Sequence, residues 1–208
     1  MIISLFLALA LQDAAPAQDR DYDACIAEVE REPGRGYSTA ARWAANSGDP
    51  AAQHCLALAE IALGKKTTGA RRLRALAEHE AGDPGLRGRL LVQAIDAFLS
   101  ADLPREAEEA ADAALAIAPT SFAVNTAAAK AFATTGRWGR VVETVDAADA
   151  DGRAAAGLII LRGRALQALG DYERALEDVI EAISRDPENI DALVLRGELL
   201  QATRAPTR

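Results

Sequence analysis

The chain has 208 residues, of which 50% are hydrophobic and only 4% aromatic, and its formal charge at pH 7 is −8. A disordered chain would lack this apolar fraction, and a protein that binds nucleic-acid phosphates would need clustered Lys and Arg. Alanine, the strongest helix former, accounts for 49 residues. These values predict an all-α protein whose small side chains let helices pack closely.

The N-terminal segment has the pattern of a secretory signal peptide. Residues 1–11, MIISLFLALAL, are apolar, and Ala15-Pro16-Ala17 follows as an A-x-A cleavage pattern. The run is too short to span a bilayer as a helix. We therefore expect residues 1–17 to be removed and the mature protein to be periplasmic or secreted, with no membrane span. No Lys or Arg precedes the run, so the alternative is an uncleaved N-terminus in a cytoplasmic protein.

Cys25 and Cys55 are the only cysteines. An even number of cysteines in an exported chain favours a disulfide, which would close a loop of about 30 residues and add roughly 3–4 kcal/mol of stability. Two buried free thiols are the alternative. No metal site or other cofactor is expected, because two cysteines and two histidines at these positions lack the spacing of metal ligands.

The sequence repeats with a period of about 34 residues, a length typical of helical repeat proteins. Leu161-Arg162-Gly163 recurs one period later as Leu195-Arg196-Gly197. In the same way, Gly136-Arg137-Trp138 aligns with Gly170-Asp171-Tyr172. Because independent segments give the same period, the repeat is a property of the whole C-terminal part.

This pattern resembles the tetratricopeptide repeat (TPR) family, whose unit of about 34 residues forms two antiparallel helices. The most regular copy spans residues 156–189, with Gly163 and Ala175 where its helices cross and Pro187 at its end. We expect Gly163 to occupy the tightest helix crossing. The resemblance implies an all-α, right-handed superhelical solenoid of antiparallel helix pairs. Gly48-Asp49-Pro50-Ala51-Ala52 also resembles Sel1-like repeats, so the subfamily of the N-terminal part stays open.

We expect irregular helix pairs in residues 18–85, with a break over 33–36 and a four-residue insertion between residues 79 and 85. TPR-like repeats follow over 86–203, and residues 204–208 form a tail. The predicted helices are 21–31, 37–47, 50–63, 68–79, 86–100, 104–117, 121–135, 138–149, 154–169, 172–186 and 190–203.

The expected stacking brings the two cysteines together. The first helices of successive pairs lie side by side in such an array, and Cys25 and Cys55 fall at matching places on two of them. A bridge requires Cα atoms roughly 5–6 Å apart, which this arrangement allows. The disulfide would therefore staple the irregular end to the rest of the array.

No group of residues indicates catalysis. His54 adjoins Cys55, but consecutive helical residues point about 100° apart, which argues against a catalytic Cys–His pair. The chain also lacks a Gly-rich phosphate loop. We therefore predict a non-catalytic exported scaffold that binds a protein or peptide. The alternative is an accessory subunit of an envelope or cell-wall enzyme complex.

In the resembled family, the first helices line a concave groove that holds peptides. Lys130 and Arg164 are one repeat period apart and would lie one above the other over an apolar floor, which suits a peptide with an acidic group. A solvated face without a ligand is the alternative. A clamp for chaperone tails is disfavoured, because Asp96 would repel a carboxylate. The predicted groove residues are Val92, Asp96, Thr126, Lys130, Ile160, Arg164, Gln167, Val194 and Glu198.

The last predicted helix, 190–203, is rich in leucine and precedes only a short tail. Repeat arrays normally end in a polar cap, so some of its apolar side chains could remain exposed as an interaction surface. The alternative, which we favour, is that they pack against residues 172–186.

Overall fold

The computed structural model describes residues 17–79, 83–152 and 154–204, with side chains described from residue 21 onward. Residues 1–16 of the expected signal peptide lie outside this description. Within these ranges the chain forms helices and no strands. The helices are α1 (Ala17–Arg31), α2 (Pro33–Ser47), α3 (Pro50–Ala62), α4 (Lys66–His79), α5 (Pro84–Ser100), α6 (Pro104–Ile117), α7 (Phe122–Thr134), α8 (Trp138–Ala148), α9 (Ala156–Leu169), α10 (Tyr172–Arg185) and α11 (Ile190–Arg204).

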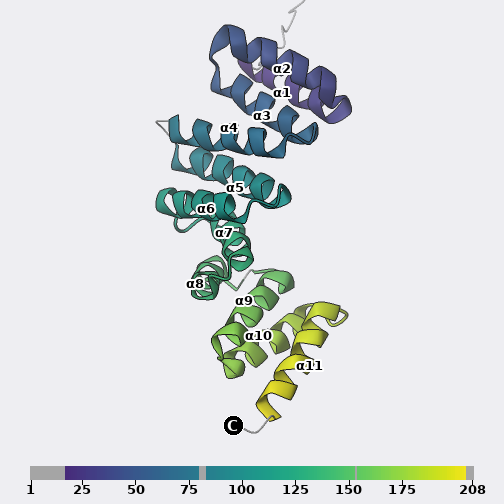
Figure 1. Ribbon diagram of the computed structural model, residues 1–208, viewed down its shortest axis with the longest axis vertical. Coiled ribbons are helices and arrows are strands. Elements are labelled where there is room, and N and C mark those ends of the chain that lie inside the picture. The colour runs from purple at the N-terminus through teal and green to yellow at the C-terminus, as the bar shows by residue number, and fades with distance from the viewer. Residues whose placement is uncertain (1–16, 80–82, 153, 205–208) are drawn as a thin grey trace, which may run out of the picture.

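The helices follow one another along the long axis of the molecule, from α1 and α2 at one end to α11 at the other (Figure 1). Each helix packs against the next one in the chain, and some alternate helices also touch, as α5 does with α7 and α9 does with α11. Packing that is confined to near neighbours defines a helical solenoid. The all-α solenoid of helix pairs predicted from the sequence is confirmed.

Proline marks the start of four helices. Pro33 lies in the first turn of α2, where its missing N–H would have no helical partner. Only Glu32 separates α1 from α2, so the break predicted over residues 33–36 is wrong. Pro50, Pro84 and Pro104 stand in the same place in α3, α5 and α6.

The turns inside the helix pairs share one left-handed residue. Gly64, Gly136 and Gly170 have φ values of 79°, 71° and 83°, and Asp102 takes φ 56° at the matching position. Asp102, Gly136 and Gly170 follow one another at exact repeat periods, whereas the interval from Gly64 to Asp102 is longer by four residues. The added length corresponds to the insertion expected between residues 79 and 85.

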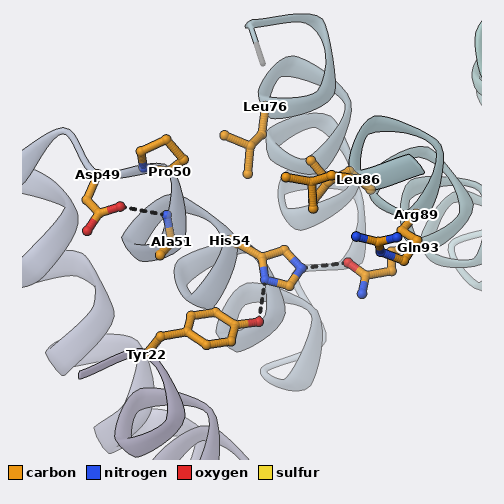
Figure 2. A pocket seen from close by; sticks show the side chains of 10 residues that line it. Tyr22, Asp49, Pro50, Ala51, His54, Leu76, Leu86, Arg89 and Gln93 are labelled. Carbon is orange, nitrogen blue, oxygen red and sulfur yellow. Dashed lines mark hydrogen bonds between the residues drawn. The ribbon is translucent and has the colours of Figure 1, made fainter. Parts of the chain in front are cut away.

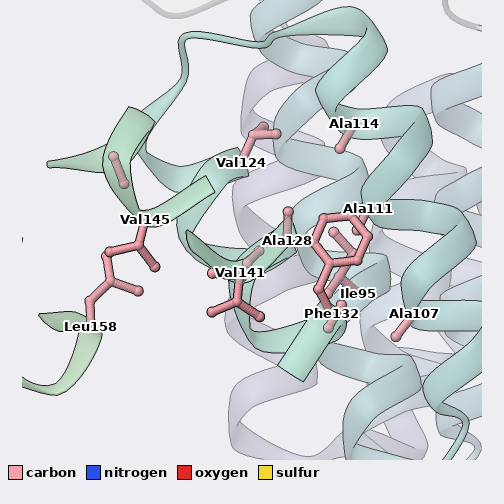
Figure 3. Close-up of a cluster of buried hydrophobic side chains, with 14 of the residues drawn as sticks. Ile95, Ala107, Ala111, Ala114, Val124, Ala128, Phe132, Val141, Val145 and Leu158 are labelled. Atoms are coloured by element: carbon pink, nitrogen blue, oxygen red, sulfur yellow. The ribbon is translucent and has the colours of Figure 1, made fainter. Parts of the chain in front are cut away.

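The buried side chains form two groups. The larger group runs from α3 to α11 and contains the buried rings of Phe98 and Phe132. Figure 3 shows Phe132 beside Ile95 and Ala111, where a small side chain leaves room for the ring. The smaller group lies in α1, α2 and α3. Helix α3 therefore belongs to both groups and joins them.

The closest helix contacts lie at the N-terminal end. A Cβ atom added to Gly36 would lie 2.6 Å from the backbone of Val29, and one added to Gly69 would lie 2.6 Å from a backbone oxygen of α3. At Gly163 the nearest atoms would be side-chain carbons at 3.4 Å. Gly163 is therefore not the tightest crossing, because it faces side chains, whereas Gly36 and Gly69 lie against backbone.

Cys25 and Cys55 form a disulfide between α1 and α3, with their Cα atoms 6.4 Å apart. Both cysteines are buried in the smaller group of core side chains. Within the described ranges, every helix is too short or too polar to cross a membrane.

Arg162 of α9 connects α9 to its two neighbouring helices through a cluster of carboxylates. The Arg162 guanidinium donates to Asp178 of α10 at 2.7 Å and to Asp146 of α8 at 2.9 Å, and it lies 3.7 Å from Asp149. The hydrogen bonds to Asp178 raise the pKa of Arg162 above its ordinary value. Burial of Asp178 raises the pKa of its carboxyl, although the bonds from Arg162 act in the opposite direction.

Candidate binding site

The predicted groove residues lie on the first helices α5, α7, α9 and α11, but they differ in exposure. Asp96, Lys130 and Glu198 are exposed. Lys130 has no ion-pair or hydrogen-bond partner among the described residues, whereas Arg164 approaches Glu198 to 3.9 Å. Lys130 is thus the predicted cation whose charge is left unpaired, and Glu198 already offsets the charge of Arg164.

The apolar floor of this groove is less exposed than the positions of its residues in the repeat predicted. Ile160 is only 5% exposed and belongs to the core, because α9 packs against both α7 and α8. Val92 also packs against the core, while Val194 is exposed and Gln167 is half-buried. A peptide on this surface would therefore touch only the small exposed part of Ile160 and would find no deep apolar floor.

Thr126, also in the predicted groove, carries an unusual hydroxyl. Within the described part of the chain, its Oγ1 is the buried side-chain atom that lacks a hydrogen-bond partner. A buried hydroxyl without a partner costs stability, and this one lies too deep to meet a ligand on the groove surface.

A second concave site lies near the N-terminal end, and the sequence did not predict it. It is a cavity of about 660 Å³ to which α1, α3, α4 and α5 all contribute, and we call it the seam pocket. Helices α3 and α5 are not among the described helix pairs that pack closely, which leaves this space between them. The residues that line the seam pocket are Tyr22, Asp49, Pro50, Ala51, His54, Leu76, Leu86, Arg89, Leu90 and Gln93.

A chain of hydrogen bonds crosses one side of the seam pocket. His54 Nδ1 lies 2.8 Å from the Tyr22 hydroxyl, and His54 Nε2 lies 2.7 Å from Gln93 Oε1 (Figure 2). Because an amide oxygen can only accept, Nε2 donates to Gln93, and in the neutral ring Nδ1 then accepts from the Tyr22 hydroxyl. Burial, together with the nearby charge of Asp23, raises the pKa of Tyr22, so the hydroxyl keeps its proton at neutral pH.

Local structure holds these side chains in place. Tyr22 lies one turn before Cys25, and His54 is next to Cys55, so the disulfide fixes the distance between their helices. Asp49 caps α3 by accepting from the backbone N–H of Ala51 at 2.9 Å. The disulfide and the cap of α3 therefore hold the polar side of the seam pocket in a fixed geometry.

Leucines line another part of the seam pocket, and Arg89 adds an exposed cation beside Gln93 on α5. Leu76 and Leu86 stand above the His54 ring in Figure 2. The Arg89 side chain is 66% exposed, and its contact with Asp83 is long, at 4.0 Å. Arg89 is therefore available to an acidic group on a ligand whose apolar part occupies the cavity.

A smaller cavity of about 540 Å³ adjoins the seam pocket and shares Pro50 and Leu76 with it. Its polar lining includes Arg72, which is held by Glu60 at 2.9 Å, and the exposed Arg71. Glu60 thus offsets the charge of Arg72, whereas Arg71 adds an exposed cation to this cavity.

In the described ranges, the side chains at the seam pocket with metal-binding or nucleophilic chemistry are engaged in structural contacts. Among the described residues, no group of His, Cys, Asp or Glu could hold a metal ion. Cys55 is in the disulfide and cannot serve as a nucleophile, and both ring nitrogens of His54 are engaged. What the seam pocket can do is bind a ligand through apolar contact and a few polar groups.

Comparisons with known proteins show the fold. No family model and no curated protein matches the chain. Among solved structures, YrrB, a TPR protein with an unusual peptide-binding site, aligns with a TM-score of 0.70 and 14% identity, over 88% of this chain and 100% of YrrB. MamA from Desulfovibrio magneticus RS-1 has a TM-score of 0.65 and 20% identity, over 74% of this chain and 85% of MamA.

The first TPR of Spaghetti (RPAP3), bound to an HSP90 peptide, has a TM-score of 0.53 and 19% identity, over 57% of this chain and 94% of that domain. These similarities confirm a TPR-like fold, as the repeat motifs predicted.

Proposed function

We propose that the protein is an exported, non-catalytic scaffold that binds a protein or peptide through its first helices. The fold supports this proposal, since YrrB and the RPAP3 domain share it and are described with a peptide-binding site and a bound peptide, respectively. Two places on the first helices are open to a ligand: the surface around Lys130 and the seam pocket.

The seam pocket is the observation that carries the proposal. Its volume of about 660 Å³ lies in the range of ligand sites, and its walls combine leucines with an exposed Arg89. A cavity of this kind would accept one or two side chains of a partner, with an acidic group near Arg89.

The disulfide supports export. Disulfides persist in oxidising compartments and are rare in the cytosol. We propose that residues 1–17 direct the protein to the periplasm or outside the cell. Mass spectrometry of the protein from cell fractions tests this: a mature chain that begins at Gln18 with no free thiol is expected. An intact Met1 with two free thiols in the cytoplasmic fraction would contradict export.

Affinity capture from the native cell, followed by mass spectrometry, tests binding. Four baits are compared: the native chain, a Lys130→Glu, Arg164→Glu double variant, an Ala51→Trp variant that fills the seam pocket, and Arg42→Glu as a control. Arg42 is exposed on α2 and lines neither cavity. We expect a partner that the native chain and the control retain.

The two remaining baits locate the site. Loss of the partner with Ala51→Trp assigns binding to the seam pocket, and loss with the double variant assigns it to the Lys130 surface. A captured enzyme whose activity falls without this chain would make the protein an accessory subunit. The scaffold proposal would be contradicted if the pure protein turned over a substrate, or if none of the four baits captured a partner.

A further inference from the structure

The last helix presents an apolar face that nothing in the described chain covers. Ala192, Leu195 and Leu199 of α11 are fully buried against the array. On its other side, Leu193 is 38% exposed and Leu200 39% exposed. The expectation that the apolar residues of this helix all pack inward is therefore wrong, because α11 is apolar on two faces and has a neighbour on only one.

The open face of α11 repeats a face of α9 that is covered. The sequence Leu-Arg-Gly, followed after two residues by Leu-Gln-Ala, begins at Leu161 in α9 and recurs from Leu195 in α11, one repeat period later. Leu193 and Leu200 thus correspond to Ile159 and Leu166, which are 0% and 2% exposed. Helix α9 packs against α10, whereas no described helix follows α11.

Gly197 in the open face of α11 marks the point where a further helix could cross, as α10 crosses α9 at Gly163. A Cβ atom on Gly163 would lie 3.4 Å from Asp178 Cβ and 3.6 Å from the Ala175 oxygen, both in α10. The matching Gly197 is exposed and has no atom within 4 Å of that point. Because α11 keeps the glycine, a helix could approach it as closely as α10 approaches α9.

The charge next to this glycine is unpaired as well. Arg162 precedes Gly163 and donates to Asp178 of α10. The matching Arg196 is exposed, and no described residue pairs with it. The residues of α10 that match the other two acids around Arg162 are Ile180 and Ile183, so the preceding helix offers Arg196 no carboxylate.

We infer that this face of α11, formed by Leu193, Arg196, Gly197 and Leu200, binds an amphipathic helix of a partner protein. The partner helix carries a small residue where it crosses Gly197 and an acid three residues later, opposite Arg196. Its expected pattern, read from Ala175 to Ala182 of α10, is Ala-x-x-Asp-Val-x-x-Ala. This goes beyond the proposed function, because it assigns a third site, distinct from the seam pocket and the Lys130 surface.

The probe is a fluorescent peptide with the sequence of α10, YERALEDVIEAISR. An isolated helix of this length is only marginally stable, so a hydrocarbon staple joins the positions of Glu173 and Glu177, which are exposed in α10. Fluorescence anisotropy with the full chain should show saturable binding. A peptide with leucine in place of Ala175 should bind about tenfold more weakly, because the larger side chain cannot fit at the crossing.

Two protein variants test the site itself. Gly197→Leu should weaken binding by about tenfold or more without lowering the melting temperature, because its side chain enters open space and leucine favours a helix over glycine. Arg196→Glu should also weaken binding, and a peptide with arginine in place of Asp178 should restore it. Such rescue by charge exchange requires the two residues to meet across the interface.

Control variants distinguish binding at α11 from binding at the other candidate sites. Arg42→Glu and the single variant Lys130→Glu, which lie on α2 and α7, should bind the α10 peptide as the native chain does, whatever the capture experiment finds. Absence of saturable peptide binding, or binding that Gly197→Leu leaves unchanged, would overturn the inference. So would a native dimer in solution that Gly197→Leu dissociates, because a second copy would then cover this face.

Discussion

Two buried glycines, Gly69 of α4 and Gly163 of α9, differ in the space around them. Gly69 lies against backbone, where an added Cβ would be 2.6 Å from a carbonyl oxygen, whereas Gly163 has room for a methyl group at 3.4 Å. Alanine also favours a helix over glycine by about 1 kcal/mol. The two effects compete, and the local space decides which prevails.

We predict opposite signs for the two alanine substitutions. Gly69→Ala should destabilise the protein by about 1–3 kcal/mol through overpacking, while Gly163→Ala should be neutral or stabilise it by up to about 1 kcal/mol. Urea unfolding of both variants measures this difference. Gly163→Leu should still cost several kcal/mol, since a longer side chain passes beyond the available space. An equal loss for both alanine variants would contradict this account.

Asp102 is strained by its backbone conformation. It has φ 56° where the neighbouring repeats use glycine. A non-glycine residue in this region costs roughly 1 kcal/mol. We predict that Asp102→Gly raises the unfolding free energy by about 0.5–1 kcal/mol, which thermal melting can detect. Asp102→Val, with a branched side chain at the same φ, should lower it.

At the scale of the helices, Arg162 holds α8, α9 and α10 together. Its side chain is 13% exposed and that of Asp178 only 8%. We predict that Arg162→Ala destabilises the protein by about 3 kcal/mol, because it leaves a buried carboxylate without its partner. Arg174→Ala, which removes only exposed ion pairs, should cost less than about 1 kcal/mol.

The deficit of Arg162→Ala should depend on pH. Loss of the arginine raises the pKa of Asp178 further above its value in the unfolded chain. A carboxyl with a raised folded-state pKa favours folding below its unfolded pKa and loses that benefit as the pH rises through the folded pKa. The deficit should therefore be smaller near pH 4 than near pH 7, as urea titrations at the two pH values would show.

The sequence predicts the helices well, because the signals that bound them are local. The repeat period, the proline starts and the turn glycines placed each helix to within a few residues. The seam pocket escaped prediction because it depends on how α3 and α5 separate, which no local signal encodes. The one relevant clue was the insertion before α5. Ile160 was misplaced for a similar reason, since its burial depends on the packing of α9 against α7 and α8.

At the scale of the whole molecule, the N-terminal end depends on its disulfide. Half of the buried residues in the smaller group of core side chains are alanines, and the group contains both cysteines. We predict that reduction, or Cys25→Ser with Cys55→Ser, lowers stability by about 3–4 kcal/mol. The loss should be regional: hydrogen exchange should accelerate in α1 and α2 but stay slow in α5 to α7. Uniform acceleration along the chain would contradict this division.

The position of the disulfide also sets how the molecule responds to a pulling force. The bond joins residues separated by 30 positions in the sequence. A stretch of this length, fully extended, spans about 100 Å. An oxidised chain pulled from its two ends would therefore lengthen by about that much less than a reduced one, and His54 and Tyr22 would stay tethered to each other even after their helices had come apart.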